Sequence, residues 1–80
     1  MTLRIVTSDE ILWEGEIEQV TLPGVEGAFT ILPHHAPLIS LLGEGTIRFV
    51  KKGETKHEER PLHKGWVKVE WDKIDVFCDE

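Results

Sequence analysis

Four histidines are the side chains with the clearest potential for metal chemistry in this sequence. His34 and His35 are adjacent, and neighbours on an extended chain point in opposite directions, so their two rings rarely bind one ion. His57 and His63 would join them only through tertiary contacts. We therefore expect no metal site, and a small metal enzyme built on the histidines ranks last among three functional hypotheses.

Other catalytic signals are absent from the sequence. Cys78 is the single thiol, so no internal disulfide forms, and its place in an apolar run favours a small buried side chain over a nucleophile. No glycine-rich phosphate loop and no CxxC, HExxH or GxSxG element is present. The carboxylates, such as Glu58 and Glu59, are typical of solvent-facing strand charge. We expect no catalytic residue and no cofactor.

Three tryptophans have two competing interpretations, as core or as a surface that binds a sugar or a partner. A buried tryptophan stabilises a small domain strongly because it removes about 150–250 Å² from water. Trp71 alternates with Val67 and Val69, which favours the core. For Trp13 and Trp66 both interpretations remain open.

Size and charge narrow the class of protein. Eighty residues predict a single domain over 1–80. The net charge of −6 repels a phosphate backbone, so we expect no nucleic-acid binding. No apolar run approaches the roughly 18 residues of a membrane helix, and residues 1–4 lack the layout of a signal peptide. We expect a soluble, intracellular protein.

The pattern of apolar residues along the chain predicts strands as the elements that hold any site. Alternating or β-rich segments recur with Gly or Pro between them, and helical periodicity is almost absent. Their apolar faces cannot all be hidden in one open sheet. We therefore predict an all-β fold, a small two-layer β-sandwich of about eight to ten short strands. The clearest strands are 3–7, 11–13, 15–22, 27–32, 38–42, 46–51, 67–71 and 74–76.

Glycine and proline predict the connections between these strands. Pro23 and Gly24 are expected to stop one strand in a tight turn. Pro33 and Pro37 predict a rigid, irregular crossing. The segment 43–45, Gly-Glu-Gly, is of the kind that joins two strands in a bulged hairpin.

Residues 21–53 carry a specific pattern. Its parts are Pro23-Gly24, Glu26-Gly27, an apolar strand, Pro33 with His35-Ala36-Pro37-Leu38, and Gly45-Thr46-Ile47-Arg48 before Gly53. In order and spacing this pattern is similar to the segment that identifies the epsilon subunit of F-type ATP synthases, called delta in mitochondria. A weaker likeness reaches both ends, so the resemblance covers the whole chain.

The resemblance implies a non-catalytic central-stalk subunit that grips the gamma subunit and rests on the c-ring of a proton-translocating ATP synthase. It places the protein peripherally, through its complex, at the cytoplasmic face of a bacterial inner membrane, or on the matrix or stroma side in an organelle. By position in the motif, the gamma-facing residues are His35, Ala36, Pro37, Leu38 and Ser40. The turn that meets the c-ring is Glu26, Gly27 and Ala28.

The sequence departs from the family pattern at several positions. The family usually has glycine where Thr30 and His34 stand, and some relatives have an acidic residue at Ala28, matching a basic c-ring loop; here Glu26 is the neighbouring carboxylate. The family also continues into a C-terminal helical hairpin, which we expect to be missing from this chain. A free-standing β-sandwich module that binds a carbohydrate or peptide through exposed tryptophans remains the alternative.

Overall fold

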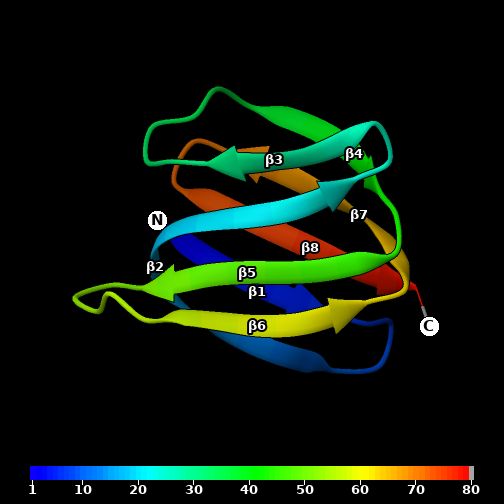
Figure 1. Ribbon diagram of the computed structural model, residues 1–80, viewed down its shortest axis with the longest axis horizontal. Coiled ribbons are helices and arrows are strands. Elements are labelled where there is room, and N and C mark those ends of the chain that lie inside the picture. Colours follow the sequence, from blue (N-terminus) through cyan, green and yellow to red (C-terminus); the bar gives the residue numbers. More distant parts are fainter. Residues whose placement is uncertain (80) are drawn as a thin grey trace.

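The computed structural model describes residues 1–79, which form eight strands and no helix (Figure 1). Glu80, the last residue of the sequence, lies outside the described residues. The strands are β1 (Thr2–Val6), β2 (Ile11–Gly24), β3 (Gly27–Ile31), β4 (Leu38–Leu42), β5 (Gly45–Lys51), β6 (His57–Leu62), β7 (Lys64–Glu70) and β8 (Lys73–Asp79).

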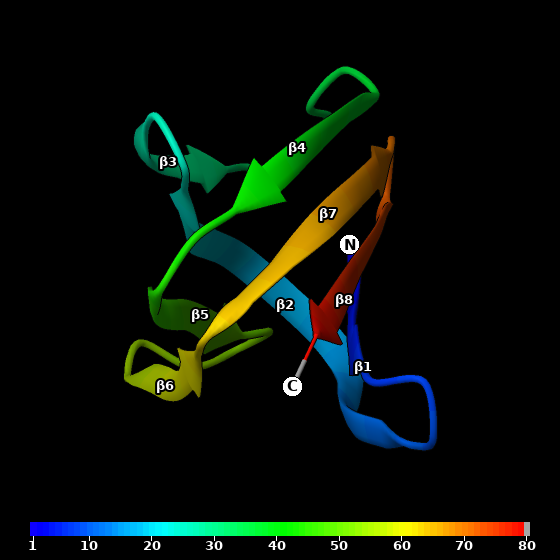
Figure 2. The same ribbon diagram turned by 90° about the vertical axis from the view of Figure 1, so that its right-hand side faces the viewer.

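The strands form two layers that share β2. The second half of β2 pairs with β3 on one side and β5 on the other, and β6 pairs with β5; these strands make the first layer. The first half of β2 pairs with β1, which is followed by β8, β7 and β4 in the second layer (Figure 2). The predicted two-layer all-β fold is confirmed.

The long strand β2 corrects two expectations. Segments 11–13 and 15–22 are one strand of 14 residues, whose register shifts between Ile17 and Gln19 where it passes from one layer to the other. Gly15 lies inside this strand and does not end it. Glycine fits this position because an added Cβ would lie 2.8 Å from the ring of Trp13. Pro23 and Gly24 do not stop the strand either, since both still pair with β3.

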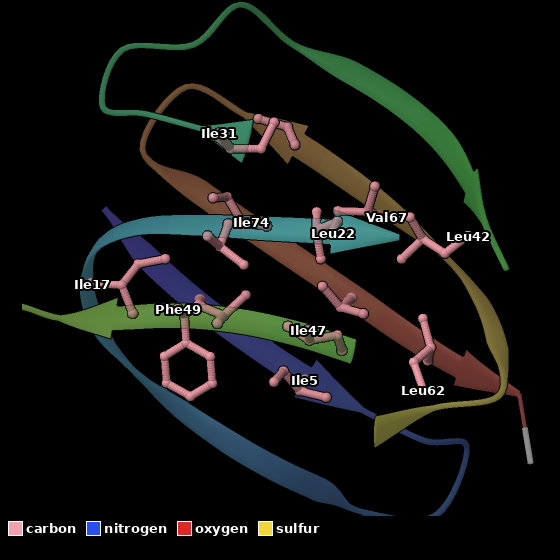
Figure 3. Packing of buried hydrophobic residues seen from close by; sticks show 14 residues of the cluster. Ile5, Ile17, Leu22, Ile31, Leu42, Ile47, Phe49, Leu62, Val67 and Ile74 are labelled. Carbon is pink, nitrogen blue, oxygen red and sulfur yellow. The ribbon is translucent and has the colours of Figure 1, made fainter. Parts of the chain in front are cut away.

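The core lies between the layers and consists of the inward residues of all eight strands (Figure 3). Phe49 is the largest fully buried side chain, and the ring of Trp13 packs against it with centroids 4.4 Å apart. Cys78 is half-buried and packs against this cluster, close to its expected place. Trp13 therefore belongs to the core.

Two sequence expectations about the second layer are wrong. Trp71 is 60% exposed, because β7 ends at Glu70 and Trp71 enters the turn to β8 with a φ of 50°. The segment 43–45 is not a hairpin, because β4 pairs with β7 while β5 pairs with β2 and β6. It crosses from one layer to the other. The predicted final hairpin, β7 with β8, is confirmed.

Candidate functional site: two contact surfaces

The turn between β2 and β3 carries the first set of predicted site residues. Glu26, Gly27 and Ala28 are all exposed, and Gly27 has a φ of 132°, a conformation that favours glycine. Two backbone hydrogen bonds join this turn to the end of β4. Val25 N–H donates to the Leu41 carbonyl at 3.2 Å, and Gly43 N–H donates to the Pro23 carbonyl at 2.8 Å. The turn is thus fixed to the second layer.

Charged residues of both signs gather at this end of the sandwich. The β4–β5 crossing brings exposed Glu44 to the same hollow as Val25, His63, Lys64 and Asp79, and Lys64 Nζ lies 3.6 Å from Asp79 Oδ2. In Figure 1 the β2–β3 turn, this crossing and the end of β8 lie at one end of the molecule. Glu44 could not be assigned to this end from the sequence, because the bonds between β2 and β4 bring the crossing beside Val25.

The predicted gamma-facing loop lies at the opposite end of the sandwich (Figure 1). His35 is half-buried and its Nδ1 lies 2.7 Å from the Ala36 carbonyl, while Ala36 and Pro37 are exposed. His34 has a φ of 68°, so it takes a left-handed conformation at the position where the family usually has glycine. Because they lie at opposite ends of the sandwich, this loop and the Glu26 turn form two separate sites.

Strand β4 connects these two ends. Leu38 packs against the core and Ser40 is half-buried, whereas Ile39 and Leu41 are 70% and 64% exposed. Side chains alternate along a strand, but the sequence Leu-Ile-Ser-Leu-Leu is apolar on both faces and does not reveal which one turns outward. Ile39 and Leu41 are the outward residues that sequence analysis missed.

A row of apolar side chains crosses the outer face of the second layer. Cross-strand partners share a face, and each member of the row is the register partner of the next. Trp66 and Phe77 stack at its centre, with ring centroids 4.2 Å apart and planes at 15°. We call these residues the apolar row: Leu41, Trp66, Phe77, Val6 and Ile11.

A row of charged side chains runs beside the apolar row. Its members, again register partners across four strands, are Lys68, Asp75, Arg4 and Glu14. Arg4 Nε donates to Asp75 Oδ1 at 3.0 Å, and Asp75 is buried with only 8% of its surface exposed. Neutralising a buried carboxylate in this way lets charge lie directly beside an apolar surface.

Neither surface has the layout of a metal centre. Within residues 1–79, no three His, Cys, Asp or Glu side chains are grouped so that they would hold a metal ion.

The described part of the chain, residues 1–79, also contains no apolar helix long enough to cross a membrane.

The sequence matches, over residues 1–80, the family described as ATP synthase, Delta/Epsilon chain, beta-sandwich domain. The chain belongs to this family. Relatives named ATP synthase epsilon chain include that of Wolinella succinogenes, 43% identical over 79 residues, and that of Campylobacter jejuni, 41% identical over 78 residues. These alignments cover 99% and 98% of this chain but 60% of each relative.

Solved structures show the same epsilon-type fold. A chain in the central stalk/c-ring structure of the Tetrahymena thermophila mitochondrial ATP synthase superposes with a TM-score of 0.82 at 15% identity, covering all of this chain and 63% of that one. A chain in the OSCP/F1/c-ring structure of the Euglena gracilis enzyme gives 0.87 at 21% identity, covering 98% of this chain and 49% of that one. The fold is therefore that of proteins seen in ATP synthase assemblies.

Proposed function

We propose that residues 1–80 form one epsilon-type β-sandwich domain that couples the gamma subunit to the c-ring of a proton-translocating rotary ATP synthase and catalyses no reaction itself. The observation that carries this proposal is the family match along the whole chain. The domain then associates with the membrane only through its complex, at the cytoplasmic face in a bacterium or on the matrix or stroma side in an organelle.

The gamma-facing surface is assigned to the loop before β4 and to the outer face of the second layer. His35, Ala36 and Pro37 contribute from the loop. Leu38 and Ser40, which alternate with the outward residues Ile39 and Leu41, contribute only through their partly exposed atoms.

The apolar row supports the second part of this assignment, because stable interfaces have an apolar, aromatic centre and a polar rim. Its members Leu41 and Trp66 lie at the Val25 end of the sheet, and exposed Ile39 continues the apolar face of β4 toward Pro37. The stacked pair of Trp66 and Phe77 supplies the centre, and the charged row supplies part of the rim.

The c-ring contact is assigned to Glu26, Gly27 and Ala28. Their exposure at a turn fixed to β4 supports a contact that transmits force, because a push on the turn reaches β4 through two backbone hydrogen bonds. Glu44, at the same end, adds a second carboxylate for a basic loop of the ring. Ala28 itself provides no charge.

Binding to purified gamma tests the first contact. Trp66→Ala is expected to weaken gamma binding by about tenfold or more, as for an aromatic residue at an interface centre. Trp71→Ala is the matched control, because Trp71 is also exposed but lies in the β7–β8 turn. If the folded protein ignores both gamma and the c-ring, the proposal fails.

Charge reversal tests the second contact in the intact complex. Glu26→Lys is expected to lower retention of the c-ring with the stalk, and Glu54→Lys, in the exposed turn before β6, is expected to leave it unchanged. Tryptophan fluorescence quenched by glycans or peptides, with no response to gamma, would instead favour the alternative of a free-standing binding module.

A further inference from the structure

Strand β3 has one paired edge and one open edge. Among the strands of residues 1–79 it pairs with β2 only, and Pro23 lies opposite Ala28. The Pro23 carbonyl accepts a hydrogen bond from Gly43 N–H on the side of β2 away from β3. The N–H and C=O of one residue in an antiparallel strand point to the same side, and the side alternates. Ala28 and Thr30 therefore direct their backbone groups away from β2, to the open edge.

A second contact supports this assignment. Thr21 and Thr30 are register partners, and their hydroxyl oxygens lie 2.9 Å apart. Such close side chains are expected for the antiparallel pairs that exchange no backbone hydrogen bonds. Across residues 1–79, no other strand pairs with the outward groups of Ala28 and Thr30.

The open edge carries neither a charged side chain nor a proline. Gly27–Ile31 reads Gly-Ala-Phe-Thr-Ile, without charge and without proline, and both outward residues are exposed. Edge strands of soluble proteins normally carry a charge, a proline or a cover, because unpaired backbone groups are a template for another strand.

We propose that β3 is a self-pairing edge, through which two copies of the free protein associate as antiparallel strands. A two-fold axis beside Phe29 places Ala28 of each copy opposite Thr30 of the other. Each such pair exchanges two N–H···O=C bonds, so the outward backbone groups of Ala28 and Thr30 in one copy all bind those of the second copy.

The net charge of −6 on each chain weakens the association of two copies, but the strands that pair carry no charge of their own. In this register Glu26 of one copy falls opposite Leu32 of the second, two residues before His34, and not opposite another carboxylate. Five residues a side bury far less than the roughly 800 Å² per partner of a standard interface, so the pairing is weak and depends on concentration.

The pairing has a consequence that rests on the proposed function. It covers Ala28 and crowds Glu26, two of the three residues assigned to the c-ring contact. A paired copy therefore does not dock on the ring, and assembly into the complex competes with self-association.

Sedimentation equilibrium of the free protein from about 10 μM to about 1 mM tests the pairing. A monomer–dimer equilibrium is expected, with concentration-dependent amide shifts at Ala28 and Thr30. Thr30→Pro removes an outward N–H without removing a bond to β2, and is expected to weaken the dimer by about tenfold or more. Thr30→Val, which keeps the N–H, is expected to dimerise like the unaltered chain.

Thr30→Lys is a second variant that keeps the backbone and places a charge on the edge, and it is also expected to prevent pairing. Circular dichroism checks that each variant folds. A protein that stays monomeric throughout, equal association of all the variants, or shifts confined to the apolar row would each overturn the proposal. Gamma binding, measured separately with Trp66→Ala, tests the proposed function independently of this result.

Discussion

Strands β3 and β6 form the two edges of the first layer, and only β6 carries outward residues that block pairing with another strand. Following the alternation from Thr21 across β5, the outward backbone groups of β6 belong to His57, Glu59 and Pro61. Pro61 has no N–H to offer, and Glu59 is charged and exposed. On β3 the outward residues are Ala28 and Thr30. One edge is closed to other strands and the other is open.

The two edges also differ in whether a partner is proposed beside them. Charge and proline on β6 prevent pairing where no partner is proposed. The uncharged β3 leads directly from the Glu26 turn, where a partner is proposed, and a charge or proline there would restrict the contacts that the turn can make.

The largest expected effect comes from the side chain that anchors each edge strand in the core. Ile31 on β3 and Leu62 on β6 are 0% and 4% exposed. Replacing either with alanine is expected to lower the free energy of unfolding by about 2–5 kcal/mol, because each leaves a cavity. Urea denaturation followed by tryptophan fluorescence measures both. A loss below about 1 kcal/mol at one of them would show that its strand is not anchored there.

Two glycines that come before β3 and β6, Gly24 at the end of β2 and Gly53 in the turn after β5, are expected to respond to alanine for different reasons. At Gly24 an added Cβ would lie 2.7 Å from the Gly27 carbonyl oxygen and 2.8 Å from Cε1 of Phe29, so Gly24→Ala should cost about 1–3 kcal/mol through overpacking. Gly53 has open space but a φ of 82°, so Gly53→Ala should cost about 1–2 kcal/mol through backbone strain. Thermal melts of the two variants compare them, and an unchanged Gly24→Ala protein would contradict the crowding.

Opening β6 tests the comparison directly. The double change Glu59→Thr with Pro61→Thr removes both protections, and we expect self-association of the free protein to increase by about tenfold at equal concentration. Glu54→Thr, in the turn before β6, is the control for the lost charge. Light scattering at matched concentrations gives the result. If the double variant associates no more than the control, Glu59 and Pro61 do not protect the edge.

The smallest effect is expected from the ion pair that joins β6 to β5. Arg48 Nε lies 3.1 Å from Glu59 Oε2, and the two side chains are 48% and 59% exposed. Water and salt screen such a pair, so Arg48→Ala should cost no more than about 1 kcal/mol. Unfolding at low and high salt checks this, since a larger, salt-independent loss would mean that the arginine acts through packing.

Much of the fold could be predicted because strand periodicity and turn residues are local signals. The patterns along 67–71 and 74–76 placed β7 and β8, and the motif over residues 21–53 led to the family. The errors arose where tertiary contacts decide. Gly15 resembles a break but accommodates the ring of Trp13, and Trp71 continues an alternation that the turn has already ended.

The candidate site was less accessible to sequence reasoning. In 38–42 the apolar residues occupy both faces, so only the pairing of β4 with β7 shows that Ile39 and Leu41 turn outward. Glu44 reaches the hollow beside Val25 through a layer crossing whose glycines had indicated a hairpin. The apolar row comes from five strands, and some neighbours across it, such as Leu41 and Trp66 or Phe77 and Val6, are far apart in sequence, so no local pattern marks it.

The parallel pairing of β1 with β8 has a consequence for synthesis on the ribosome. Thr2–Val6 lies beside Lys73–Phe77, so the first strand made finds one of its two neighbours only after the last strand has left the exit tunnel. Until then the second layer lacks its middle, and Leu3 and Ile5 have no complete core to enter. The two layers are therefore expected to pack together in one step after β8 has emerged, and not strand by strand during synthesis.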